Sequence, residues 1–166
     1  MRHLKLSLLA AGIGILLSVP ACTPSVSDSG DTWLKGTAEE KFDRIAEQLG
    51  GFDATMMSVS HKYQELYWAG QDKNWDYAAY QIEEMREEIE RGIERRPERA
   101  ESAQMIFPAL DQMEEAITAR DAALFDQRFT GLTATCNTCH RQEDMAFIAV
   151  APPQQRLSIV QPLSDE

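Results

Sequence analysis

One stretch decides the fold class: residues 75–95 are WDYAAYQIEEMREEIERGIER. Its apolar residues recur every three or four positions, and charged residues fill the positions between them. This spacing puts the apolar side chains on one side of an α-helix, because the helix makes one turn in about 3.6 residues. The stretch therefore predicts an amphipathic helix. Its apolar face carries Trp75, Ala78, Ile82, Met85, Ile89 and Ile93.

The segment before this stretch has the same period. Residues 52–71 predict a helix, and a short connection that ends at Asn74 joins it to the next one. Asn74 suits the N-cap position, because its side-chain oxygen can accept a hydrogen bond from a free backbone N–H of the first turn. The apolar face of the first helix carries Met56, Val59, Tyr63, Leu66 and Tyr67.

Two more helices are predicted after this stretch. Residues 97–118 begin with Pro97, which suits a first helical turn, and Pro108 should bend this helix. Asp121 can cap a further helix over residues 122–146. No run of alternating β-branched residues is long enough to predict a sheet. Four amphipathic helices with short connections predict an all-α, up-down-up-down four-helix bundle.

The predicted bundle domain occupies residues 38–150. Thr37, followed three residues later by Glu40, has the pattern of a capping box and predicts a helix that Gly50-Gly51 breaks or kinks. Residues 151–166 are predicted to form an irregular tail, because the chain contains three prolines between Phe147 and Glu166.

The first 22 residues have the layout of a secretory signal. A short basic start precedes a mostly apolar run, Leu6 to Val19, which is too short for a membrane span. Cys22 follows a small residue, as in the cleavage box of bacterial lipoproteins, where the cysteine becomes lipidated. Pro20 departs from that box, so ordinary signal cleavage and a buried N-terminal helix stay as alternatives. We expect a periplasmic or other extracytoplasmic location.

Residues 23–37 are rich in Ser, Thr, Asp and Gly, and they predict a flexible tether between Cys22 and the folded domain. The chain has a net charge of −11, and loss of Arg2 and Lys5 with residues 1–22 makes it −13. This charge argues against nucleic acid as a partner and against direct binding to anionic lipid, so membrane contact is expected only through a lipid anchor. It suits a protein partner with a basic docking surface, and the alternative is that the acidic residues only solvate the outer faces of long helices.

A short motif near the end of the last predicted helix carries the chemistry. Cys136-Asn137-Thr138-Cys139-His140 is the attachment signature of c-type haem. Two thiols three positions apart lie near one helix face, so each can form a thioether with one vinyl group. The histidine then serves as the proximal iron ligand. The sequence predicts one covalent haem c, joined to Cys136 and Cys139 and ligated by His140.

Other uses of this motif fit less well. A thioredoxin-type redox pair expects a βαβ setting that the sequence does not predict. A structural zinc site needs four ligands, and the mature chain would have only His61 and His140 as histidines and no second cysteine pair. A plain disulfide between Cys136 and Cys139 would leave His140 without a role.

The motif at the end of a fourth helix resembles the four-helix-bundle cytochromes of the cytochrome c-prime type and their low-spin, methionine-ligated relatives. Leu66-Tyr67-Trp68-Ala69-Gly70, with Asn74-Trp75 and Ala78-Ala79-Tyr80, also resembles a set of exported bundle proteins with one C-terminal haem motif. The resemblance covers roughly residues 52–150. It implies an electron carrier, with homodimer formation through the first two helices as an option. The tail after the motif is longer than in these relatives.

The sixth iron ligand would decide the function. Measured from the end of the bundle at residues 70 and 121, His140 lies about 28 Å along its helix, Met56 about 21 Å and His61 about 13 Å. Met56 is therefore the preferred distal candidate, as in the methionine-ligated relatives, and His61 is the alternative. Met57 lies about 100° away from Met56 on the helix, on the stripe that His61 shares.

Two further residues are predicted to contact the haem. Arg141 can pair with a propionate, and Tyr63 shares the face of Met56 and can pack against the flat cofactor. The leading prediction is electron transfer rather than an enzymatic reaction. An open iron site that binds nitric oxide or carbon monoxide is the alternative. Peroxide reduction ranks lower, because it needs a distal base or cation and the first helix offers only His61.

Overall fold

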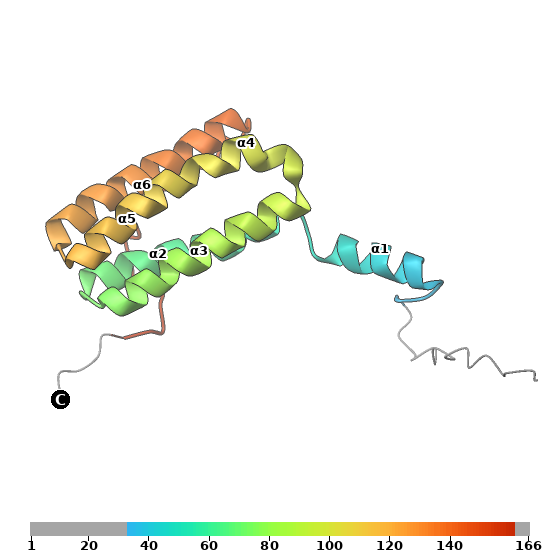
Figure 1. Cartoon of the computed structure of the whole chain (residues 1–166), viewed down its shortest axis with the longest axis horizontal. Helices are drawn as coiled ribbons and strands as arrows, with labels where there is room; N and C mark the ends of the chain where they lie inside the picture. The colour runs from blue at the N-terminus through green and yellow to red at the C-terminus, as the bar shows by residue number, and fades with distance from the viewer. Residues whose placement is uncertain (1–32, 162–166) are drawn as a thin grey trace, which may run out of the picture. The chain divides into compact units, whose positions relative to one another are not determined.

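The computed structural model describes residues 33–161, and within this range the chain has helices and no strand (Figure 1). The contacts divide the chain into two units, one up to Lys41 and one from Phe42 onward. The predicted signal at residues 1–22, Cys22 and most of the predicted tether lie outside the described residues. None of the described helices is both long and apolar enough to span a bilayer.

The helices follow one another with short connections. Helices α2 and α3 have the predicted bounds, while the predicted helix over 97–118 is a series of shorter elements. The elements are α1 (Ala38–Gln48), α2 (Phe52–Gln71), α3 (Trp75–Arg95), η1 (Pro97–Arg99), α4 (Ala100–Ala103), η2 (Gln104–Ile106), α5 (Phe107–Ala119) and α6 (Ala122–Gln142).

Side-chain caps begin three of these helices as the sequence predicts. Thr37 accepts a hydrogen bond from the Glu40 N–H at 3.2 Å, and Glu40 accepts one from the Thr37 N–H at 2.7 Å. The Asn74 side chain accepts from the Tyr77 N–H at 3.2 Å. Asp121 accepts from two N–H groups in the first turn of α6. These bonds satisfy donors that have no partner within the helix.

Four helices pack around a common core. Helix α2 contacts α3 and α6, and α5 contacts the same two helices. Figure 1 shows α2 beside α3 and α5 beside α6. Each helix contributes fully buried apolar side chains, and burial of apolar surface is the main stabilising term of such a bundle. The largest fully buried apolar residues are Leu66, Met85, Leu110, Met113, Phe125 and Leu132.

Helices α2 and α6 pair in opposite directions along their length. Gly70 faces Phe125 so closely that an added Cβ would overlap the aromatic ring. One to two turns earlier in α2, the Tyr67 and Tyr63 rings lie 5.1 and 4.7 Å from the Phe129 ring. The pairing fixes how residues of α2 line up with those of α6.

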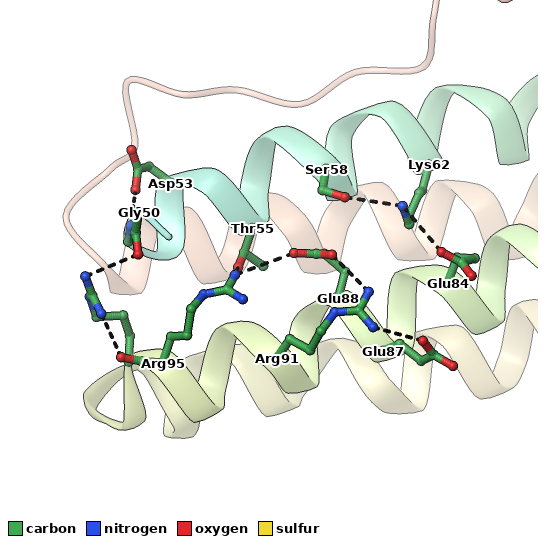
Figure 2. A network of polar contacts seen from close by, with 12 residues as sticks. Gly50, Asp53, Thr55, Ser58, Lys62, Glu84, Glu87, Glu88, Arg91 and Arg95 are labelled. Carbon is green, nitrogen blue, oxygen red and sulfur yellow. Dashed lines mark hydrogen bonds and ion pairs between the residues drawn. The ribbon is translucent and has the colours of Figure 1, made fainter. Parts of the chain in front are cut away.

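Polar contacts hold the first half of α2 against α3 (Figure 2). Arg95 donates to the hydroxyl of the fully buried Thr55 at 2.7 Å and lies 3.6 Å from the Glu88 carboxylate. Two turns further along α2, Lys62 bonds Ser58 at 3.2 Å and lies 3.7 Å from Glu84. The Arg95 bond matters most, because it satisfies a hydroxyl that burial removes from water.

Residues 143–161 have no regular element, which confirms the irregular tail predicted from residue 151 onward, although residues 143–146 were predicted to be helical. The tail still docks on α2. Arg156 donates two hydrogen bonds to Asp72, and its guanidinium lies 4.8 Å from the Trp68 ring centroid. Ser158 donates to the buried carboxylate of Glu65 at 2.6 Å, and Tyr77 of α3 donates to the same oxygen at 2.9 Å. The tail therefore runs from α6 to the outer face of α2.

Candidate functional site

The cysteine–histidine motif lies in the last two turns of α6. Cys136, Cys139 and His140 are all half-buried, and the Cys136 side chain packs against the hydrophobic core. Both cysteines are free thiols. Because they are three positions apart, they lie near the same face of the helix. The motif thus presents two thiols on one face, close to the core and still reachable from the surface.

Burial sets the protonation state of these thiols. It raises the pKa of Cys136 to about 11, and the neighbouring Cys139 adds to this rise. Burial also raises the pKa of Cys139, although a hydrogen bond with Ser102 and the charge of Arg99 act in the opposite direction. Both cysteines are therefore protonated at neutral pH in the folded chain.

Helix α6 ends at Gln142, four residues before the predicted end. Asp144 adopts a left-handed conformation, with φ of 57°. The Met145 N–H bonds the His140 carbonyl at 2.7 Å, and the Asp144 N–H bonds the Arg141 carbonyl at 3.4 Å. This is a Schellman-type helix end, in which a left-handed residue turns the chain back and satisfies the last carbonyls. Such a residue is usually glycine, so Asp144 gave little signal in the sequence.

The chain that turns back makes a contact with the histidine of the motif. The Nδ1 atom of His140 lies 2.8 Å from the Ile148 carbonyl oxygen. A carbonyl can only accept, so Nδ1 is the donor in this contact, and in a neutral imidazole Nε2 then keeps the lone pair. Metal-ligating histidines are commonly oriented in this way, with the second nitrogen bound to a fixed acceptor.

Asn137, between the two cysteines, holds the same returning segment. Its amide nitrogen donates to the Val150 carbonyl at 2.9 Å, and its oxygen accepts from the Val150 N–H at 2.8 Å. The nitrogen also donates to the Thr133 carbonyl at 3.1 Å. Every donor of the amide group is therefore used, which fixes the side chain. Sequence reasoning assigned Asn137 no role, because its partner lies thirteen residues away in a segment without regular structure.

Tyr63 faces the motif from α2. The tyrosine is buried, and its hydroxyl lies 2.7 Å from that of Thr133, one turn before Cys136. Burial raises the pKa of Tyr63 to about 12, and the Thr133 hydrogen bond offsets part of the effect. The structure therefore brings Tyr63 to the predicted site as a neutral hydroxyl on the wall between α2 and α6.

The two distal candidates lie on different sides of α2. Met56 is half-buried and packs against the core, whereas His61 is exposed and the neighbouring Met57 is 75% exposed. Met56 lies seven residues before Tyr63, and His140 lies seven residues after Thr133. Because Tyr63 and Thr133 are in contact on antiparallel helices, Met56 and His140 lie at about the same level of the bundle.

Arg141 does not reach toward the core. It is exposed, and its guanidinium donates to the Thr138 hydroxyl one turn earlier at 2.8 Å. A different arginine lies close to the motif. Arg99 forms an ion pair with Glu143, whose carboxylate also accepts from Ser102 near Cys139. This cluster could not be predicted from the sequence, because η1 and α4 come from a segment predicted only as one bent helix.

Among residues 33–161, no three Cys, His, Asp or Glu side chains converge as a common metal site requires. The chain matches no family model, and comparisons with curated proteins and with solved structures also gave no match.

Proposed function

We propose that this chain is an exported mono-haem c-type cytochrome that carries electrons. In this proposal one haem c is joined by thioethers to Cys136 and Cys139, and His140 is the proximal ligand. The observation that carries the proposal is the arrangement of CNTCH at the end of α6, with two free thiols on one face and the His140 Nδ1 atom occupied by a backbone carbonyl.

The residues present fit such a group. Haem attachment needs two thiols that reach the porphyrin edge, and both cysteines are free and half-buried rather than sealed in the core. It also needs an imidazole nitrogen that can bind iron, and with Nδ1 donating to Ile148 the neutral imidazole has its lone pair on Nε2. A convergent set of ligands is not required, because the sulfurs bond to carbon atoms of the porphyrin and not to the iron.

We propose Met56 as the second axial ligand in an up-down-up-down bundle. Its level on α2 matches that of His140, and it is half-buried against the core. His61 is exposed on the outer side of α2 and is the weaker candidate. A thioether ligand favours the reduced iron more than a second imidazole does, so Met56 would raise the reduction potential.

The bound haem supplies a one-electron redox couple. The chain's own contribution is to hold both axial side chains on packed helices, so that little rearranges when the charge changes. Tyr63 and Phe129 line the wall between α2 and α6 and keep water from this side. Arg141, which is exposed, stays a candidate for contact with a propionate.

The site of action and the partners belong to the same proposal. A lipid anchor at Cys22 would keep the protein near a membrane redox enzyme outside the cytosol. With a net charge of −11 for the whole chain, the partner would present a basic docking surface. A homodimer is compatible with the proposal, and nucleic acid is not expected as a partner.

Optical spectra of the haem-loaded wild type, Met56→Ala and Met57→Ala test the assignment. We expect a low-spin spectrum with a sharp reduced α-band and the weak near-infrared band of His/Met ligation. Met56→Ala should become high-spin and bind carbon monoxide, and Met57→Ala, with its exposed side chain, should behave as the wild type. An unchanged spectrum in Met56→Ala would exclude this ligand. A wild type that is already high-spin and binds carbon monoxide would favour gas binding instead of electron transfer.

A further inference from the structure

We propose that Asn137 is a positioning residue for the axial histidine. In this inference, which rests on the proposed function, the Asn137 side chain holds the segment after α6 in place, and that segment holds the His140 ring through Ile148. The residue between two haem-attaching cysteines would thus set the orientation and basicity of the iron ligand, although it contacts neither iron nor haem.

The first step is the bond between Asn137 and the returning chain. The amide group pairs with both backbone groups of Val150, at 2.9 and 2.8 Å, as a neighbouring strand would. A third bond, to the Thr133 carbonyl, ties the same amide group to α6. The returning chain is therefore fixed to the helix at a point one turn before His140.

The second step leads from Val150 to the imidazole. The returning segment is tied to the end of α6 by the bond from Met145 to the His140 carbonyl, and the Ile148 N–H bonds the Met145 carbonyl at 2.8 Å. Ile148 therefore lies between the end of α6 on one side and the Asn137–Val150 pairing, called the Asn137 clamp below, on the other. Its carbonyl oxygen is held 2.8 Å from Nδ1 of His140.

The chemical consequence concerns Nε2. A fixed acceptor on Nδ1 keeps the hydrogen there and leaves the lone pair on Nε2, and it also makes the imidazole a stronger donor to a metal. Without the clamp, Ile148 belongs to an exposed loop that water can compete with. The ring would then rotate, and both tautomers would be populated.

The other residue between the cysteines offers a matched control. The Thr138 hydroxyl donates to the Ala134 carbonyl of its own helix at 2.9 Å and accepts from Arg141. No bond joins it to residues 148–150 within the described range. Thr138→Ala therefore changes the motif to a similar extent without touching the returning segment.

The first experiment uses the haem-loaded protein and follows the loss of His140 from the iron on acidification. Removing a partner in the outer shell of a metal ligand lowers metal affinity about 10- to 100-fold. We expect the midpoint of ligand loss in Asn137→Ala to rise by at least about one pH unit, which corresponds to tenfold. Thr138→Ala should keep the wild-type midpoint. Equal midpoints for wild type and Asn137→Ala would overturn the inference.

The second experiment does not depend on the haem. Nitrogen NMR of His140 in the full chain, made without cytochrome-assembly machinery, reports the tautomer. The wild type and Thr138→Ala should carry the hydrogen on Nδ1, and Asn137→Ala should shift toward the Nε2–H form. Val150→Pro, which removes one N–H of the clamp and leaves the motif intact, should shift in the same direction. A tautomer that is insensitive to both Asn137→Ala and Val150→Pro would disprove the positioning role.

The two experiments separate the two proposals. If no haem becomes attached but the tautomer depends on Asn137, the proposed function fails and the positioning role stands. If haem becomes attached and neither the acid midpoint nor the tautomer responds to Asn137→Ala, the positioning role fails and haem attachment stands.

Discussion

Arg156 of the tail donates two hydrogen bonds to the Asp72 carboxylate at the end of α2, at 2.7 and 2.5 Å. The guanidinium also lies over the Trp68 ring. The apolar residues around it do not share in the docking, since Leu157 is 78% and Ile159 is 94% exposed. Polar contacts at Arg156 and Ser158 therefore hold the end of the tail, and a single substitution should release it.

Arg156→Ala should free the tail without unfolding the bundle. Hydrogen bonds to charged groups contribute about 1.5–3 kcal/mol each when well formed, and partial exposure of both side chains, 24% and 16%, reduces this value. We expect exchange of the Val160 amide, whose N–H bonds the docked Ser158 hydroxyl at 3.0 Å, to become about tenfold faster or more, while exchange in α2 and α6 stays as it was. Arg141→Ala, at an exposed arginine, is the control. Equal tail protection in wild type and Arg156→Ala would contradict the docking described here.

Gly70 is required where α2 meets α6. A Cβ at this position would overlap the Phe125 ring, whereas a Cβ at Gly131 of α6 would have nothing within 4 Å. Gly70→Ala should lower the free energy of unfolding by about 1–3 kcal/mol, the usual cost of overpacking. Gly131→Ala should raise it by about 0.5–1 kcal/mol, because alanine is the better helix former. Chemical denaturation measures both, and a neutral Gly70→Ala would show that the two helices pack less closely.

Alkaline pH should destabilise the fold through Tyr63. Burial raises its pKa from 10.0 to about 12. The unfolded chain therefore loses this proton first, and stability present below about pH 10 is lost between about pH 10 and 12. For one side chain whose pKa rises by about two units the loss amounts to about 3 kcal/mol.

Tyr63→Phe tests this contribution, because phenylalanine keeps the ring and has no proton to lose. Denaturation midpoints across the alkaline range should fall less steeply with pH in the variant than in the wild type. The control is Tyr67→Phe, which removes a hydroxyl from a half-buried tyrosine one turn further along α2. Identical pH profiles for wild type and Tyr63→Phe would mean that burial does not raise the pKa of the Tyr63 hydroxyl.

The sequence predicted the helices well where a local signal marks their ends. Asn74 and Asp121 cap α3 and α6 as expected. The bounds of α2 follow from its periodicity and from the Gly50-Gly51 break before it. The end of α6 was wrong by four residues, because Asp144 adopts a left-handed conformation that usually signals glycine. The helix predicted over residues 97–118 is divided into η1, α4, η2 and α5, and Pro108 lies in the first turn of α5 and not inside a continuous helix.

The motif residues were evident from spacing alone, but the shell around them was not. The bonds from Asn137 to Val150 and from His140 to Ile148 depend on how an irregular segment folds back, and no periodicity describes such a segment. The same holds for Arg156 and Asp72, which are eighty-four residues apart. As the proposed axial ligand, Met56 is favoured over His61 by its position along α2 and by its burial. From the sequence alone, this preference could rest only on the predicted helix lengths.

Intact mass under denaturing conditions tests the central claim most directly. The full chain is produced in a bacterial host that has cytochrome-assembly machinery, next to a variant with Cys136→Ser and Cys139→Ser. The account predicts a wild-type mass increased by one haem that organic extraction does not remove, and no such increase in the double variant. A wild-type chain that carries no haem under these conditions would contradict it.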